Sequence, residues 1–241
     1  MNALNAIVLP IAQTDIQGRT GDSCIASNGF CPSWIADNIG EYVNPFLEHI
    51  YLTVVSVGIG FALAFALAVL AHRVGWTFGP ISGATQVLYT IPSIAAFFLL
   101  LPITGRGNLT AIVALVAYTL FILFSNIMTG LGNVPDDVKD SARGMGLTDR
   151  QLLWRVELPL AMPEILAGLR IATTTTIGLA TLAFFAGGGG LGLEISSGAD
   201  RVFKSNVAVV GMLTVLLAAA FDLLILGFQR LVTPWRAAAR A

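Results

Sequence analysis

Few residues of this 241-residue sequence have the types and spacing that chemistry requires. The two histidines, His49 and His72, stand at opposite ends of one apolar run, and the two cysteines, Cys24 and Cys31, form neither a CxxC motif nor a Cys/His cluster. A metal centre takes several such ligands at close spacing. The apolar runs also hold no paired carboxylates and no nucleophile beside a base. We therefore predict no metal ligand and no catalytic residue.

A glycine-rich run resembles a nucleotide-binding motif. Gly187, Gly189 and Gly192 literally fit G-x-G-x-x-G. That motif binds a dinucleotide when it follows a strand and opens a helix of a βαβ unit, whereas these glycines follow an apolar helix. The sequence also contains no Walker A motif, so the chain alone cannot hydrolyse ATP. We expect the glycines to turn the chain sharply at the outer end of that helix.

Two formal charges, Arg170 and Asp222, interrupt otherwise apolar runs. Each would cost about 2.5–3.5 kcal/mol at the centre of a bilayer on insertion scales. Both lie at similar distances from the same end of their runs, so at about 1.5 Å per residue their depths agree within a few ångströms. We predict that both face the protein interior and pair, directly or through water. The alternative is that Arg170 reaches the interface alone.

Polar side chains in two apolar runs are candidates for a transport pathway. Tyr89, Thr90 and Ser93 flank Pro92, which removes a helical hydrogen bond and predicts a kink that can line a cavity. Aromatic faces such as that of Tyr89 attract quaternary ammonium groups. Thr174 belongs to a run of four threonines, most of which we expect to donate to their own i−4 carbonyls. For all of these residues, plain packing is the alternative.

The elements that position these residues are apolar helices. Hydrophobic residues make up 56% of the chain and charged residues 11%, against about 25% charged in typical soluble domains. Open sheet edges cannot exist in hydrocarbon, and the apolar runs lack the alternation of barrel strands. We predict an all-α polytopic membrane protein with about five transmembrane helices. The predicted spans cover residues 47–71, 83–103, 109–131, 163–186 and 206–232.

The distribution of Lys and Arg predicts the orientation. Five spans place the termini on opposite sides of the membrane, and nine of the 13 Lys and Arg residues then fall on one side, which the positive-inside rule makes cytoplasmic. The N-terminus is therefore expected outside and the C-terminus inside. The predicted parts are an extracytoplasmic tail at 1–46, a transmembrane domain at 47–234 with a cytoplasmic loop at 132–162, and a cytoplasmic tail at 235–241.

The outer tail carries both cysteines. An exterior compartment lets a disulfide persist, and the spacing of Cys24 and Cys31 allows a small loop. Two unpaired thiols are the alternative. The tail could cover the outer mouth, contact another protein or stay loose. The net charge of −1 and the lack of a basic tract give no reason to expect a nucleic-acid partner.

The loop at 132–162 is long for a connection, and long loops are commonly functional. Pro135 suits a first helical turn, and the acidic residues after it complement the positive end of a helix dipole. Gly144 and Gly146 permit the left-handed residue that ends a helix. The first half of the loop is therefore predicted to be a short helix.

The second half of the loop predicts another short helix. Thr148 and Gln151 fit a capping box, and apolar residues follow among charged ones over 149–158. Pro159 is expected to stop this helix, and Pro163 to restart the chain as the fourth span. A bent pair of helices with small residues at its turn is well suited to docking another protein.

The same loop resembles the EAA motif of binding-protein-dependent ABC importer permeases, which reads EAA, three residues, Gly, nine residues, an aliphatic residue, one residue, Leu-Pro. The matching positions are Asp140, Ser141, Ala142, Gly146, Val156, Leu158 and Pro159. Asp140 stands where Glu is usual, and Ser141 stands where Ala is usual. The segments at 89–93 and 186–192 also resemble permeases of glycine betaine/carnitine/choline (osmoprotectant) importers, and the resemblance covers about residues 50–230.

The resemblance implies the type I importer permease fold and a larger complex. Two permease subunits, identical or different, would pair in the lipid bilayer. Two ATP-binding subunits, which hold ATP and magnesium, would dock on the cytoplasmic loops, and an extracytoplasmic binding protein would deliver substrate. No cofactor is expected on this chain. The residues expected at the ATPase contact are Asp140, Ser141, Ala142, Gly146, Leu147, Leu158 and Pro159.

The function that the resemblance implies is import of small osmoprotectants, such as glycine betaine, choline or carnitine, across the bacterial cytoplasmic membrane. Within the same class, a permease for another small solute such as an amino acid is the alternative. Outside it, the alternative is a channel or a gradient-driven transporter with Asp222 as an ion site. The long loop argues against that alternative, because such a transporter has no ATPase to dock.

Overall fold

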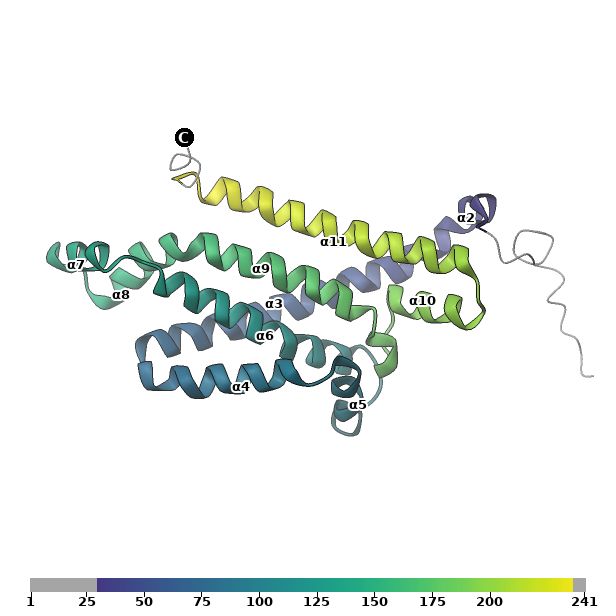
Figure 1. Cartoon of the computed structure of the whole chain (residues 1–241), viewed down its shortest axis with the longest axis horizontal. Coiled ribbons are helices and arrows are strands. Elements are labelled where there is room, and N and C mark those ends of the chain that lie inside the picture. Colours follow the sequence, from purple (N-terminus) through teal and green to yellow (C-terminus); the bar gives the residue numbers. More distant parts are fainter. Residues whose placement is uncertain (1–29, 236–241) are drawn as a thin grey trace, which may run out of the picture.

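The computed structural model describes residues 30–235, and all regular structure in that range is helical. The prediction of an all-α fold is therefore confirmed. The long helices lie side by side and give the molecule an elongated shape, with shorter helices at their ends and flanks (Figure 1). The long helices are α3 (Val43–Arg73), α6 (Asn108–Gly132), α9 (Leu158–Ala180) and α11 (Lys204–Val232).

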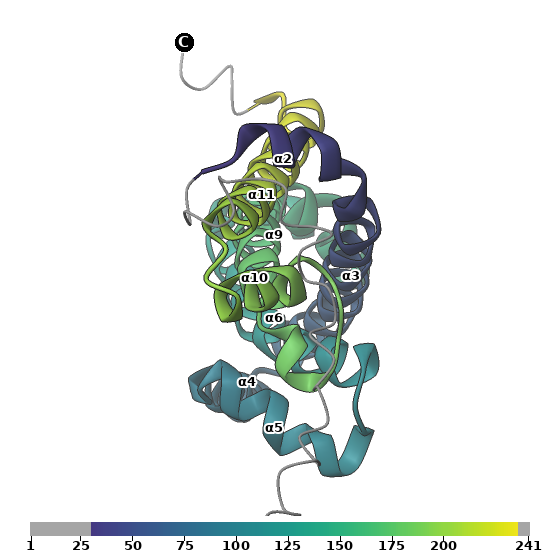
Figure 2. The same ribbon diagram turned by 90° about the vertical axis from the view of Figure 1, so that its right-hand side faces the viewer.

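The helix α6 lies at the centre of this bundle. Around it pack α3, α9, α4 (Phe78–Thr90) and α5 (Ser93–Thr104). Its apolar side chains enter both large core clusters, one near its start and the other near its end; the second contains Leu123, Ile127 and Leu131, all fully buried. In Figure 2, α4 and α5 lie on one side of the bundle and α11 lies on the opposite side.

Small residues let the central helices approach closely. A Cβ at Gly60 of α3 would lie 1.9 Å from Oγ1 of Thr119 on α6. A Cβ at Gly168 of α9 would lie 2.4 Å from Cβ of Asn126 on α6. Glycine at helix crossings is typical of membrane proteins, where van der Waals packing rather than hydrophobic burial drives helix association.

The lengths and apolarity of the helices match four of the five predicted spans. Within residues 30–235, three helical segments are long and apolar enough to cross a membrane, and a bent pair would make a fourth. The predicted fourth span, α9, is not among them, because its 23 residues include Glu164, Arg170 and four threonines. The segments that pass are Pro32–Arg73, Asn108–Gly132, Lys204–Val232 and the pair Gly75–Thr90 with Ser93–Thr104.

The prediction of a single span at 83–103 is wrong as to its shape, because this stretch is two helices bent by 101°. Ile91 takes an extended conformation with ψ of 128°, and Pro92 precedes the first residue of α5. Proline disfavours the helical conformation of the residue before it and supplies no N–H for the ladder. The expected kink is thus a full break.

The end of the bundle that carries the glycine run is closed by short helices. The glycines connect η5 (Ala183–Ala186) to α10 (Leu191–Asp200), a helix that the sequence did not predict. Positive φ values at Gly187 (78°) and Gly190 (87°) turn the chain there, as predicted. We call this the glycine end, and we call the opposite end of the bundle, from which the connection between α6 and α9 projects, the loop end (Figure 1).

The described part of the predicted outer tail is ordered and packs on the bundle. α2 (Pro32–Asn38) and η2 (Ile39–Tyr42) lead into α3. Tyr42 donates its hydroxyl to Oδ1 of Asn206 at 2.5 Å, and the ring of Trp34 meets that of Phe203 edge to face. The remainder of the tail, at 1–29, and residues 236–241 lie outside the described residues.

Candidate functional site

The connection between α6 and α9 projects from the loop end as two short helices (Figure 1). The first, α7 (Asp136–Gly144), begins directly after Pro135, whose extended backbone serves as the N-cap. Asp136 and Asp137 occupy its first turn and complement the positive end of the helix dipole. The first predicted helix of the loop is confirmed.

Gly146 ends α7 in the way that its residue type predicts. Its φ of +86° lies in the left-handed region. Its N–H donates to the carbonyl of Arg143 at 2.8 Å, and the N–H of Leu147 donates to the carbonyl of Ala142 at 3.2 Å. These two bonds form a Schellman motif, which satisfies the last carbonyls of the helix. A side chain at this position would strain the backbone.

The capping box that opens the second helix is also confirmed. The N–H of Thr148 donates to Oε1 of Gln151 at 2.9 Å, and the N–H of Gln151 donates back to Oγ1 of Thr148. The helix that follows, α8, runs over Asp149–Leu152. Its start is therefore fixed by side chains that the sequence already specifies.

The prediction that Pro159 stops the second helix is wrong. A turn of π-helix, η4 (Leu153–Glu157), follows α8 and leads directly into α9, so the chain is helical from 149 to 180. The N–H of Leu158 donates to the carbonyl of Leu153, five residues back. A wider turn leaves room for the ring of Pro159 at the start of α9. The side chain of Gln229 donates to the carbonyl of Pro163 at 3.0 Å.

The predicted contact residues divide into an exposed set and a buried set. Asp140, Ser141 and Gly146 are exposed. Ala142 is 2% exposed and Leu158 is 5% exposed, and both pack inside the protein. Leu147 and Pro159 are half-buried. The exposed part of the surface also carries two large apolar side chains, Met145 (74% exposed) and Trp154 (52% exposed).

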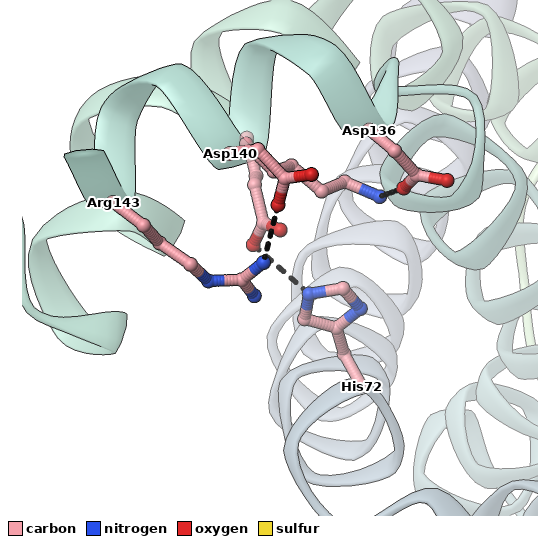
Figure 3. A network of polar contacts seen from close by, with 6 residues as sticks. His72, Asp136, Asp140 and Arg143 are labelled. Carbon is pink, nitrogen blue, oxygen red and sulfur yellow. Dashed lines mark hydrogen bonds and ion pairs between the residues drawn. The ribbon is translucent and has the colours of Figure 1, made fainter.

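Two of the three acidic side chains of α7 form ion pairs with basic side chains of the same helix (Figure 3). Lys139 lies 3.2 Å from Asp136, and Arg143 lies 3.3 Å from Asp140. Exposed pairs of this kind contribute about 0–1 kcal/mol, so they orient side chains more than they stabilise the helix. The Ser141 hydroxyl donates to the carbonyl of Asp137 at 2.7 Å. With three Asp against one Lys and one Arg, α7 is polar and carries a net charge of −1.

A partly buried hydrogen bond beside the loop escaped the sequence analysis. Nε2 of His72, at the end of α3, lies 2.9 Å from Oε2 of Glu157 on η4 (Figure 3). Glu157 is only 4% exposed. The available signal was an acidic residue between two aliphatic ones, Val156 and Leu158. A separation of 85 residues hid its partner.

Arg170 and Asp222 lie face to face between α9 and α11. Nε of Arg170 donates to Oδ1 of Asp222 at 2.8 Å, and Nη2 donates to Oδ2 at 2.7 Å. This two-pronged geometry is the strongest form of a guanidinium–carboxylate pair. The observed contact is direct, and it neutralises both charges within the bundle.

The predicted pathway residues lie on three helices. Tyr89 and Thr90 end α4, Ser93 begins α5, and Thr174 lies in α9. The ring of Tyr89 packs 5.0 Å from that of Phe121 on α6.

The hydroxyls in these helices mostly serve their own backbone. Oγ1 of Thr174 donates to the carbonyl of Arg170 at 3.0 Å, and Thr173 and Thr176 donate to carbonyls four residues back at 2.7 Å. The predicted back-bonding is thus confirmed for three of the four threonines. Oγ1 of Thr90 likewise donates to the carbonyl of Val87 at 2.8 Å.

Tyr118 of α6 is a further polar residue that the sequence analysis missed. Its hydroxyl donates to the carbonyl of Ile91, at the break between α4 and α5. The break frees backbone carbonyls that a continuous helix would use, and a buried hydroxyl needs an acceptor. A tyrosine inside an apolar run, with a proline in the preceding run, was the available signal.

Three elements meet in a polar cluster at the glycine end. Glu48 of α3 accepts from Nδ2 of Asn108 at 2.8 Å and from the N–H of Gly190 at 3.2 Å. Oδ1 of Asn108 accepts from the N–H of Gly189 at 3.2 Å. A Cβ at Gly189 would lie 2.0 Å from the Glu48 carboxylate, so the close approach requires glycine. Next to it, Nε2 of the buried His49 donates to the carbonyl of Ile177 at 3.0 Å.

Cys31 is disulfide-bonded and fully buried. Its N–H donates to Oγ of Ser205 at 2.8 Å, which ties it to the start of α11. Cys24, the other member of the predicted bridge, lies outside the described residues.

Comparison with known proteins places this architecture in a defined group. A family described as "binding-protein-dependent transport system inner membrane component" matches residues 56–237. The glycine betaine/carnitine/choline transport system permease protein OpuCB of Bacillus subtilis is 34% identical over 84% of this chain and 93% of that protein. The osmoprotectant import permease protein OsmW of Salmonella typhimurium is 34% identical over 83% of this chain and 96% of that protein.

Solved structures share the fold. A chain of the methionine ABC transporter MetNI in an inward-facing conformation superposes with a TM-score of 0.74 at 22% identity, over 84% of this chain and all of that chain. A chain of an amino acid ABC transporter superposes with a TM-score of 0.70 at 17% identity. The matches in sequence and in fold agree, and the chain belongs to the binding-protein-dependent transport system inner membrane components.

Proposed function

We propose that this chain is the transmembrane permease subunit of an ATP-driven importer for small osmoprotectants that carry a quaternary amine. The observation that supports the substrate class is the sequence identity of 34–35% to permeases for glycine betaine, carnitine and choline over more than four fifths of the chain. The projecting pair of helices at the loop end supports ATP-driven transport, because a gradient-driven transporter has no ATPase to dock.

In this proposal the ATP-binding subunit docks on α7 and α8. Asp140, Ser141 and Gly146 contact the ATPase directly, since they are exposed. Ala142 and Leu158 are buried, so they support the contact indirectly by packing the loop against the helix bundle. Leu147 and Pro159, both half-buried, border the contact. The exposed Met145 supplies apolar area, because an exposed methionine adapts its shape to a partner.

The remaining parts of the machine follow from the same proposal. A second permease subunit, identical or different, completes the pathway in the membrane. The loop end faces the cytoplasm and the glycine end faces the exterior, where a binding protein delivers substrate. ATP and magnesium are held by the partner ATPase, whose closure pulls the loops together and switches the pathway between two states. This chain supplies no catalytic residue.

The alternative of Asp222 as an ion site is less well supported. Both of its carboxylate oxygens accept from Arg170, and a paired carboxylate is already neutralised. The solved structures of amino acid importers share only the fold at 22% and 17% identity, and they give no reason to prefer an amino acid as substrate.

Co-purification with the candidate ATP-binding subunit tests the proposal. The wild-type chain is expected to carry the ATPase through purification in detergent. Gly146→Asp is expected to insert in the membrane and lose it, because it strains the left-handed turn and adds a charge to the contact. Gly40→Asp is the matched control, since Gly40 lies near α2 with open space around it. An ATPase that associates with neither chain would contradict the proposal.

A further inference from the structure

A buried acid connects the loop to a helix with which it is not continuous. The chain runs from α6 through three residues into α7, and from η4 directly into α9. By contrast, α3 ends at Arg73 and the chain turns away into α4. The connection of α3 to the loop is therefore made by side chains.

The first of these side-chain contacts joins His72 to Glu157, with Nε2 and Oε2 at 2.9 Å. The Nε2–H group can donate in either charge state of the ring. Glu157 is 4% exposed, and a buried carboxylate without a donor is strongly unfavourable. Each group therefore fixes the position of the other, and the contact is geometrically specific.

A second contact lies on the same faces of both elements. The ring of Phe65 lies 6.1 Å from that of Trp154. Phe65 and His72 are two helical turns apart on the same face of α3, and Trp154 and Glu157 both belong to η4. The backbones of α3 and η4 are not among the closely packed element pairs. Side chains thus join α3 and η4 at two points, the His72–Glu157 bond and the Phe65–Trp154 ring contact.

The element that carries Trp154 and Glu157 is a π-helical turn. Such turns insert an extra residue, are rare, and are frequently found at functional sites. Here the turn lies between the exposed helix α8 and the long helix α9. A movement of α7 and α8 is therefore transmitted to this turn before it reaches the membrane-spanning part of α9.

We propose that His72 and Glu157 are positioning residues that make α3 move together with the loop during transport. This inference rests on the proposed function, since it assumes that an ATPase moves the loop. According to this inference, the movement of the loop reaches the π-helical turn first. From there the backbone transmits it to α9, and the His72–Glu157 bond transmits it to α3. Loss of the bond leaves ATP hydrolysis intact but delivers less of its movement to the spans.

The test uses the whole complex reconstituted in liposomes with its ATP-binding subunit and binding protein. Two quantities are measured together: ATP hydrolysis and uptake of radiolabelled glycine betaine. The variants are His72→Ala, Glu157→Ala, the double variant and Glu157→Gln. Arg73→Ala is the matched control, because Arg73 is exposed and adjacent to His72 on the same helix.

Each single alanine variant is expected to raise the number of ATP molecules hydrolysed per glycine betaine imported by about tenfold, and the double variant by no more than either single one, because the two residues act through one bond. Glu157→Gln keeps an oxygen that accepts from His72, so its ratio is expected to stay within about twofold of wild type. Arg73→Ala is expected to behave as wild type.

Other outcomes overturn the inference. An unchanged ratio in the alanine variants would show that the bond transmits nothing. A double variant whose effect equals the product of the single effects would show that the two residues act independently. Variants that lose the ATPase on purification would show that the pair supports docking instead. If the wild-type chain fails to bind the ATPase, the proposed function itself fails, and that result is separate from the other three.

Discussion

Polar side chains in this protein mostly bond to other polar groups. Without such partners, polar groups in apolar surroundings would be energetically costly. The guanidinium of Arg170 donates to both carboxylate oxygens of Asp222. The hydroxyl of Tyr118 donates to the carbonyl of Ile91 at the α4–α5 break, and Glu157 is hydrogen-bonded to His72. The chain's own charges and hydroxyls thus pair with one another where helices meet.

The Arg170–Asp222 pair yields a stability prediction. Asp222→Asn leaves the guanidinium without its counter-charge, and we expect a loss of about 2–3 kcal/mol in the free energy of unfolding, the cost of one unpaired charge within a span. The double variant Arg170→Leu with Asp222→Leu removes both charges and is expected to recover most of that loss. Unfolding of the purified protein by SDS titration measures both. A double variant no more stable than the single one would show that the pair is not the source of the effect.

Two kinds of contact hold the helices together: close crossings at glycine residues, and contacts between long side chains. The glycines bring backbones together where α3 and α9 cross α6, and the apolar clusters fill the space around these crossings. Where helices do not approach closely, long side chains span the gap, as between α3 and η4. Helix position therefore depends on a few identifiable residues.

The crossing of α3 and α6 gives a second prediction. Gly60→Ala would place a Cβ 1.9 Å from Oγ1 of Thr119, and we expect a loss of about 1–3 kcal/mol, as for other overpacked positions. Gly58→Ala is the matched control on the same helix, because nothing lies within 4 Å of its Cβ. It is expected to be neutral or slightly stabilising, since alanine favours a helix. Equal effects of the two changes in the same SDS titration would rule out the crossing as the cause.

The molecule has a different construction at its two ends. The loop end presents exposed helices on a buried base, which suits docking to a partner. At the glycine end, backbone amides of the glycine run are bonded to the side chains of Glu48 and Asn108, so that α3, α6 and the chain after α9 are tied together. If the two ends change conformation together, the polar cluster makes α3, α6 and the chain after α9 move together at the glycine end.

The polar cluster gives a third prediction. Glu48→Ala removes the acceptor for the N–H of Gly190 and for the Asn108 amide. We expect hydrogen exchange in the glycine run to accelerate by about tenfold or more, because each lost hydrogen bond is worth about 1 kcal/mol and tenfold corresponds to about 1.4 kcal/mol. Exchange measured by mass spectrometry checks this, with the exposed Glu41→Ala as control. Unchanged exchange would mean that the steric fit of the glycines alone holds the run.

Much of this molecule was predictable because its strongest signals are local. Apolar run length located the ends of the long helices to within six residues, and the capping box at Thr148 and the turn at Gly146 formed as their residue types require. Each of these features is fixed by neighbours within one or two helical turns. The family resemblance rested on the same kind of local spacing.

The errors and omissions of the sequence analysis share one physical cause. They involve contacts between residues far apart in the chain, or contacts that override the local conformational preference of a residue. Pro159 should end a helix, but a π-helical turn accommodates it within a chain that remains helical from 149 to 180. The bonds His72–Glu157, Tyr118–Ile91 and Glu48–Gly190 join residues separated by 85, 27 and 142 positions. Residue types and spacing determined the helices, the turns, the polar groups that need partners and, from equal depth in the membrane, the Arg170–Asp222 pair. The partners of the other groups were decided by helix packing, because only packing brings distant positions within hydrogen-bonding distance.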